Sequence, residues 1–229
     1  MKLVIGERYR HLLENRLRKL DTEVIWLPDN PYLDSRLAGH ADLNVFCKES
    51  FVLASKWAYP YIVNSLTPYA VAVESALEQS AMYPADAGLC ACWTGKHLIY
   101  NPRTADPMIP ANVSGDHIAV KQGYTKCSVC VVSDDAIITS DHAVAQKAAN
   151  AGLDVLEVSP AYVVLEGFDY GFIGGATFKI NKRQLAFTGT LSEHPDKERI
   201  YGFLAKHGIE PVFLTNLPIF DIGGAVALP

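Results

Sequence analysis

The sequence predicts an α/β fold in which five copies of one β-β-α-β unit form a ring, as a five-bladed α/β propeller. Two observations predict it. A short apolar strand recurs five times, each time ahead of a helical or irregular stretch. The last segment of the chain also supplies the one strand that its first segment lacks. With 229 residues, 49% of them hydrophobic, we expect one domain spanning residues 1–229.

The recurring apolar strands are the middle strands of the units, at residues 2–6, 51–55, 97–101, 136–140 and 185–189. A second apolar strand precedes four of them across a polar turn, which is typical of a hairpin. These preceding strands begin at Leu43, Leu89, Ser128 and Gly171. The fifth stands at residues 222–228, so we expect the ring to close by pairing the two chain ends.

A helix and a third strand should complete each unit. Three helices are clear, because they have an apolar face or the expected end signals: residues 8–20, the stretch from Asp141 to Gly152, and the stretch from Pro195 to Gly208. The crossovers at residues 56–69 and 104–115 each contain two prolines, so we expect them to be short or irregular. Third strands are predicted after each crossover, for example EVIWL and DVLEV.

Composition and charge exclude several classes of protein. A net charge of -5 without Lys/Arg runs argues against nucleic acid as a partner. The absence of a long apolar run argues against a membrane span and a signal peptide, and we expect a cytoplasmic protein. Two Gly-Gly pairs, at Gly174 and Gly223, precede strands and not helices, so no nucleotide cofactor is expected. The sequence does not indicate the oligomeric state.

Five cysteines, an odd number, agree with a reducing compartment. Cys90 and Cys92 would share one face of a strand, whereas Cys127 and Cys130 would point to opposite faces of another. This spacing does not fit a zinc knuckle, and we expect neither a metal site nor any cofactor. The alternative role for these residues is that of small apolar side chains in buried strands.

Polar residues stand where each unit begins. If five units surround an axis, equivalent strand starts converge on it, so these residues predict a polar central channel lined by acids. The alternative is that aspartates flank strands because they favour turns. The residues are Asp42, Asp86, Lys126 with Cys127, Asp169 and Asp221.

This pattern resembles the pentein fold of guanidine-modifying enzymes, among them dimethylarginine dimethylaminohydrolase, arginine deiminase and agmatine deiminase. Asp42, in DLNVF, and Asp86, before Ala87-Gly88, resemble the acids of the first and second blades. The resemblance implies a small cationic ligand, guanidino or amino-acid-like, gripped by carboxylates. The expected ligand-binding residues are Asp42, Asn44, Asp86, Lys126, Asp169 and Asp221.

The chain departs from the pentein enzymes at both residues of their chemistry. No histidine stands at residues 122–124, and no cysteine follows the second Gly-Gly pair. Cys127 is the candidate nucleophile, with its thiol pKa lowered by Lys126, and His40 the candidate proton carrier. With these two residues in these roles, the protein would be a hydrolase acting on C–N bonds of guanidino compounds. The alternatives are a buried cysteine, a loop histidine, and a non-catalytic interaction protein or scaffold with this fold.

Overall fold

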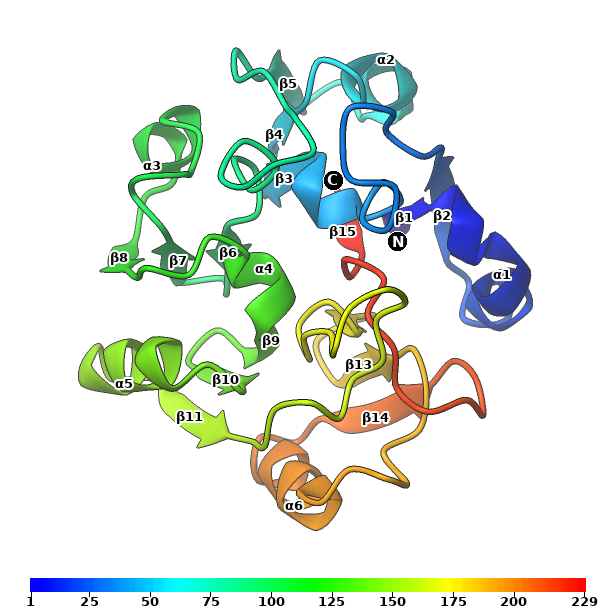
Figure 1. The fold of residues 1–229 in the computed structure, drawn as a ribbon, viewed down its shortest axis with the longest axis vertical. Coiled ribbons are helices and arrows are strands. Elements are labelled where there is room, and N and C mark those ends of the chain that lie inside the picture. The colour runs from blue at the N-terminus through cyan, green and yellow to red at the C-terminus, as the bar shows by residue number, and fades with distance from the viewer.

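The computed structural model describes residues 1–229 and arranges five three-stranded sheets around a common centre (Figure 1). In each sheet the inner strand pairs antiparallel with the middle strand, which pairs parallel with the outer strand. The predicted ring of five β-β-α-β units is therefore confirmed.

The sheets follow one another in chain order, except that the first takes its inner strand from the C-terminus. From inner to outer strand they are β15 (Val226–Leu228), β1 (Lys2–Gly6) and β2 (Glu23–Leu27); β3 (Val45–Lys48), β4 (Phe51–Ala54) and β5 (Val71–Glu74); β6 (Cys92–Trp93), β7 (His97–Tyr100) and β8 (Asp116–Ala119); β9 (Val129–Ser133), β10 (Ala136–Thr139) and β11 (Asp154–Glu157); β12 (Thr177–Lys179), β13 (Gln184–Phe187) and β14 (Glu210–Phe213).

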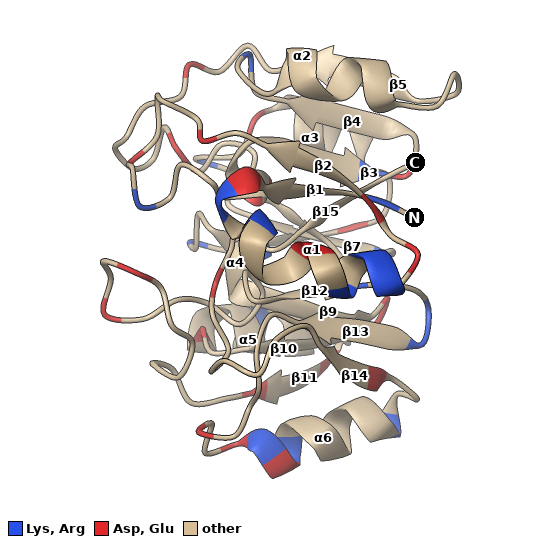
Figure 2. Ribbon diagram, turned by 90° about the vertical axis from the view of Figure 1, so that its right-hand side faces the viewer, with Lys and Arg blue, Asp and Glu red and all other residues tan.

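The two chain ends close the first sheet, as the sequence predicts. In the antiparallel pair of β15 with β1, Leu228 faces Lys2 and Val226 faces Val4. The N- and C-termini consequently lie close together on one side of the molecule (Figure 2). The ring is held shut by ordinary ladder hydrogen bonds and by the side chains that flank them.

One helix connects the middle and outer strands of each sheet: α1 (Arg10–Lys19), α2 (Tyr59–Ile62), α3 (Met108–Asn112), α5 (His142–Asn150) and α6 (Lys197–Lys206). The proline-containing α2 and α3 are short, as expected. Asp141 caps α5 by accepting a hydrogen bond from the Val144 amide (3.0 Å). The last helix begins two residues after Pro195, a small correction to its predicted start. None of the helices combines the length and the apolarity that crossing a bilayer would require.

The inner strands begin later than predicted, because the chain first turns over the centre of the ring. The 3-10 helix Ala41–Leu43 precedes β3, and the one-turn helix α4 (Thr125–Ser128) precedes β9. The Gly-Gly pairs allow a close backbone approach here: the Gly224 amide donates to the Gly175 carbonyl (2.7 Å). The residues ahead of the inner strands, and not the strands themselves, therefore fill the centre.

Buried apolar side chains lie between neighbouring sheets, so the core consists of five wedges. Leu3 and Ile5 of β1 pack with Phe178 of β12 in the last sheet, for example, while Val4, on the other face of β1, packs with Val52 of β4. This alternation follows from the two-residue period of a strand. Because each blade buries both faces of its sheet, no blade has a complete core alone.

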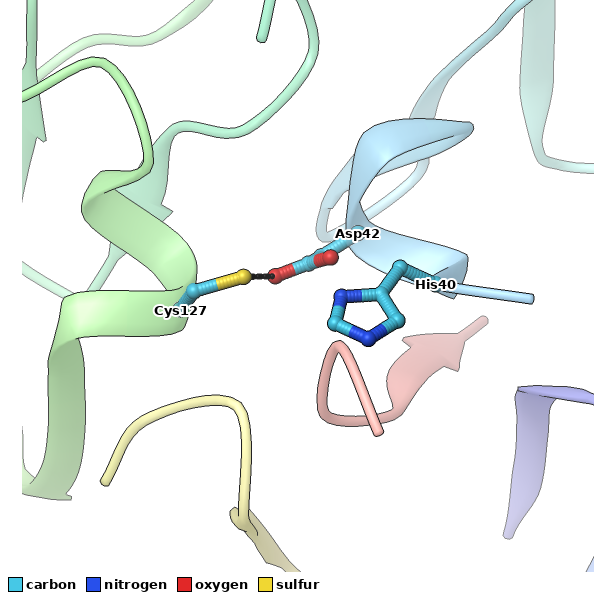
Figure 3. Close-up of side chains that lie close together, drawn as sticks. All are labelled: His40, Asp42 and Cys127. Atoms are coloured by element: carbon cyan, nitrogen blue, oxygen red, sulfur yellow. Dashed lines mark hydrogen bonds between the residues drawn. The ribbon is translucent and has the colours of Figure 1, made fainter. Parts of the chain in front are cut away.

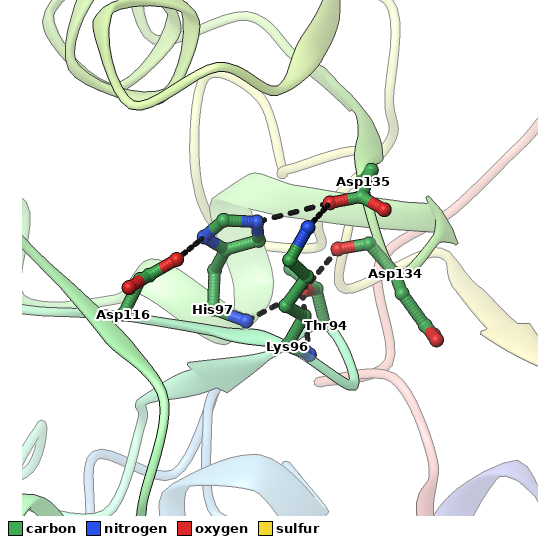
Figure 4. Close-up of polar contacts among 6 residues, drawn as sticks. All are labelled: Thr94, Lys96, His97, Asp116, Asp134 and Asp135. Atoms are coloured by element: carbon green, nitrogen blue, oxygen red, sulfur yellow. Dashed lines mark hydrogen bonds and ion pairs between the residues drawn. The ribbon is translucent and has the colours of Figure 1, made fainter.

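Polar side chains join the third and fourth blades at the outer end of their hairpins (Figure 4). His97 is buried, and its Nε2 lies 3.2 Å from Asp135 Oδ1, which Lys96 Nζ also contacts at 2.7 Å. Thr94 Oγ1 donates to the Asp134 carbonyl (2.7 Å). The carboxylates here are largely exposed and already paired, so this cluster fastens two blades together.

Candidate active site

Three side chains from two distant parts of the chain meet at the centre of the ring (Figure 3). They are His40, Asp42 and Cys127, all buried, and their ligating atoms lie within 4.8 Å of one another. Asp42 belongs to the 3-10 helix before β3, and Cys127 to α4 before β9. The two residues predicted as nucleophile and proton carrier are thus brought together beside a predicted acid.

Asn44 holds the backbone that carries His40 and Asp42. Its side-chain amide donates to the His40 carbonyl (2.9 Å), while its Oδ1 accepts hydrogen bonds from Asn30 Nδ2 (2.7 Å) and Ser55 Oγ (3.2 Å). The side chain is fully buried behind the site. Asn44 is therefore placed as a positioning residue and does not line the cavity above Cys127.

The Cys127 thiol donates a hydrogen bond to Asp42 Oδ2 at 2.7 Å. Cys90 Sγ lies 4.0 Å from Cys127 Sγ and 3.6 Å from Asp42 Oδ2. The hydrogen bond with Cys90, burial and the nearby Asp42 carboxylate all raise the pKa of the Cys127 thiol well above its usual value.

Two predictions about Cys127 are wrong. Cys127 lies in a helical turn and not in a strand, because the chain bends over the centre before β9 begins. The pKa of the Cys127 thiol is also raised and not lowered as predicted from Lys126, because the hydrogen bond with Cys90 and burial dominate.

Asp42 and His40 retain unused hydrogen-bonding capacity at the centre. Asp42 is fully buried, and burial raises its pKa, against the opposing effects of His40 and Cys127. Asp42 Oδ1 and His40 Nε2 are both buried without a hydrogen-bond partner. Buried polar atoms without partners are rare, and they are typical of sites that hold a ligand, an ion or water.

A cavity of about 330 Å³ opens above these residues. Asp169 is exposed at its rim, and Asp221 is held in its wall by the amides of Phe172 and Gly223, each donating at 2.8 Å. The lining of this cavity contains no Lys or Arg, and most of its residues are hydrophobic. It consists of Leu37, His40, Leu43, Tyr124, Cys127, Leu165, Phe168, Asp169, Tyr170, Phe172 and Asp221.

Asp86 stands behind the cavity wall. The Tyr124 hydroxyl donates to Asp86 Oδ2 (2.6 Å), and burial raises the pKa of both groups. Tyr124 lines the cavity, whereas Asp86 does not. Asp86 therefore fixes the orientation of a wall residue through Oδ2, and its other oxygen, Oδ1, is buried without a partner.

Lys126 lines a second cavity, of about 460 Å³, at the opposite ends of the inner strands. Residues that follow these strands, such as Glu49 and Gly95, line it together with residues of the strands themselves, whereas no residue of an inner strand lines the first cavity. Of the predicted ligand-binding residues, Asp169 and Asp221 thus line the first cavity, whereas Lys126 lines the second.

Sequence reasoning missed Cys90 as a neighbour of Cys127 and missed the aromatic wall of the first cavity. The wall comes from residues 168–172, FDYGF, which lie just ahead of and at the start of the strand predicted from Gly171. The available signal was the run of aromatic residues just ahead of an inner strand. Polar residues at the same position in other units already predicted that this position lies at the centre of the ring.

The sequence matches the family described as "Family of unknown function (DUF6873)" over residues 4–226. No curated protein matches it.

Solved structures with similar folds are enzymes that act on guanidino groups. The chain has 10% identity and a TM-score of 0.54 to dimethylarginine dimethylaminohydrolase from Pseudomonas aeruginosa, covering 93% of this chain and 91% of that one. Agmatine deiminase from C. jejuni has 10% identity and a TM-score of 0.51, and the match covers 93% of this chain and 75% of that one. An amidinotransferase from Microseira wollei has 7% identity and a TM-score of 0.53, and the match covers 96% of this chain and 93% of that one. These likenesses confirm the predicted pentein fold.

Proposed function

Since the chain belongs to the family of unknown function DUF6873 and has the pentein fold, we propose that it binds a small guanidino or amino-acid-like cation in the cavity above Cys127. The observation that carries this proposal is the charge of the cavity lining. Asp169 and Asp221 contribute two carboxylates, and none of the lining residues is Lys or Arg. A cation that moves from water into this cavity needs a carboxylate partner, because burying an unpaired charge is unfavourable in free energy.

The shape of the lining agrees with a planar, extended cation. Phe168, Tyr170 and Phe172 offer aromatic faces, over which a guanidinium stacks favourably. Arg36 already packs over Phe168, 4.1 Å from the ring, and Asp34 neutralises its charge. The planar head of the ligand lies over Cys127 and His40 in this proposal, with the ammonium or aliphatic part toward Asp169.

Hydrolysis at the guanidinium carbon is the reaction that these groups would perform. A bound cation favours the thiolate, so the S–H proton passes to Asp42 as Cys127 Sγ forms a bond to the carbon. His40 carries that proton to the leaving amine as the C–N bond breaks. Water then adds to the thiouronium carbon and releases the urea product; one water proton restores the thiol, and the other leaves with the amine as an ammonium ion.

A binding protein without turnover is the second candidate, and one observation favours it. Cys127 is buried and its thiol pKa is raised, whereas catalytic cysteines ordinarily have lowered values. Turnover of the bound cation distinguishes the two functions, since both share the same cavity.

Arginine and citrulline provide a matched pair of probes, because citrulline replaces the guanidinium with an uncharged urea of the same shape. We expect calorimetric titration to show arginine binding at least about tenfold more tightly than citrulline. The variant Asp169→Asn should weaken the binding of both probes roughly fivefold, as expected for about 1 kcal/mol at an exposed charge pair, because both carry the ammonium group that lies toward Asp169.

Asp21→Asn is the control, because it removes one exposed negative charge in the turn after α1, away from the cavity. Asn tolerates the positive φ of that position (54°). Equal binding of the two probes to the wild-type protein would refute the proposal, as would equal effects of the two substitutions.

A further inference from the structure

We infer that the centre of the ring binds one zinc-class divalent cation through His40, Asp42, Cys90 and Cys127. Three of these residues already place a nitrogen, an oxygen and a sulfur within 4.8 Å of one another (Figure 3). All four are buried, none more than 3% exposed. This inference rests on their geometry alone and does not depend on the proposed function.

The distances from Cys90 to Cys127 and to Asp42 are close to those of tetrahedral coordination. With Zn–S bonds of about 2.3 Å and Zn–O bonds of about 2.0 Å, two sulfur ligands lie about 3.8 Å apart, and a sulfur and an oxygen about 3.5 Å apart. Cys90 Sγ lies 4.0 Å from Cys127 Sγ and 3.6 Å from Asp42 Oδ2. The contact between Cys127 and Asp42, now a 2.7 Å hydrogen bond, lengthens by about 0.8 Å when a metal replaces the proton.

Two unpartnered atoms point to a ligand at this place. His40 Nε2 and Asp42 Oδ1 are buried, and neither has a hydrogen-bond partner. One metal ion would provide a bond for the imidazole and neutralise the carboxylate in the same step. The backbone beneath is already fixed, since the Asn44 amide holds the His40 carbonyl and the Cys127 carbonyl accepts from the Gly175 amide (2.7 Å).

The donor set selects the class of metal. Two thiolates, an imidazole and a carboxylate suit zinc, whereas calcium and magnesium prefer oxygen ligands alone. With four protein ligands the coordination is closed, so the bound metal performs no hydrolysis itself. It occupies Cys127 and His40 and therefore opposes the organic cation in the cavity above.

The test is a titration of the metal-free full-length protein with Zn²⁺ against a chromophoric chelator. We expect one equivalent to bind, and Cys127→Ser and Cys90→Ser each to weaken binding at least about tenfold. Co²⁺ should give the thiolate charge-transfer band and the intense visible bands of a tetrahedral site. Circular dichroism checks that each variant is folded, and the cobalt spectrum of the wild-type protein supports or overturns the site without any substitution.

Cys47→Ser is the matched control, because Cys47 is a partly exposed thiol outside the cluster. It should leave zinc affinity unchanged, and so should Asp169→Asn, which alters the cavity rim and no proposed ligand. Failure of arginine binding with intact zinc binding would count against the proposed function only. The absence of one-equivalent binding, an octahedral cobalt spectrum, or equal affinity in the wild type and Cys127→Ser would overturn the metal site.

Discussion

Cys127→Ser is expected to bind arginine with nearly unchanged affinity while losing at least about a thousandfold in turnover of guanidino substrates. Serine keeps a hydrogen-bond donor toward Asp42, so the buried carboxylate stays partnered and the cavity keeps its shape. Its hydroxyl is a far weaker nucleophile than a thiol. The measurement is release of ammonia or amine from a panel of guanidino compounds, beside calorimetric binding of the same compounds.

The matched control is Cys47→Ser, because Cys47 does not line the cavity above Cys127. It should retain full turnover. Retained turnover in Cys127→Ser would refute the assignment of the nucleophile. Tight binding without turnover in the wild-type protein would instead establish the non-catalytic candidate.

Gly223→Ala is expected to lower the free energy of unfolding by about 2–4 kcal/mol. Gly223 has φ of 71°, a conformation that favours glycine. An added Cβ would lie 2.5 Å from His40 Cβ and 2.6 Å from His40 Cα. Because backbone as well as side chain stands in the way, the substitution must also displace His40. Urea denaturation measures the loss of stability, and arginine titration should show weakened binding.

Gly202→Ala provides the comparison for that substitution. Gly202 lies within α6, and nothing is found within 4 Å of the position of an added Cβ. Alanine should therefore raise the free energy of unfolding by about 0.5–1 kcal/mol. Equal effects at the two glycines would show that the close approach of Gly223 to His40 is not a constraint on the fold.

The ring could be predicted because its signals are local and repeated. Each middle strand is a short apolar run, and Gly152 and Pro60 mark a helix end and a broken helix within a few residues of sequence. Closure by residues 222–228 followed from counting strands: four units had an inner strand, and the fifth lacked one. The starts of the inner strands were predicted one to six residues too early, because the chain turns over the centre of the ring within the first part of each apolar run.

The site was only partly predictable because its contacts are long-range. Cys127 and Asp42 are 85 positions apart, and nothing in either neighbourhood shows that a thiol donates to a carboxylate. Adjacency in sequence suggested that Lys126 acts on Cys127, but consecutive residues of a helical turn point in different directions. Register placed Asp86 near the centre, yet only the fold shows that Tyr124 stands between it and the cavity.

The central claim is that Cys127 lies beneath a cavity selective for planar cations. Its most direct test compares alkylation by chloroacetamidine, a planar cation, with alkylation by neutral chloroacetamide, mapping each cysteine by mass spectrometry. We predict that Cys127 reacts at least about tenfold faster with the cationic reagent, that arginine protects it, and that Cys47 shows neither effect. Equal rates for the two reagents at Cys127, or a cationic preference shared with Cys47, would contradict the claim.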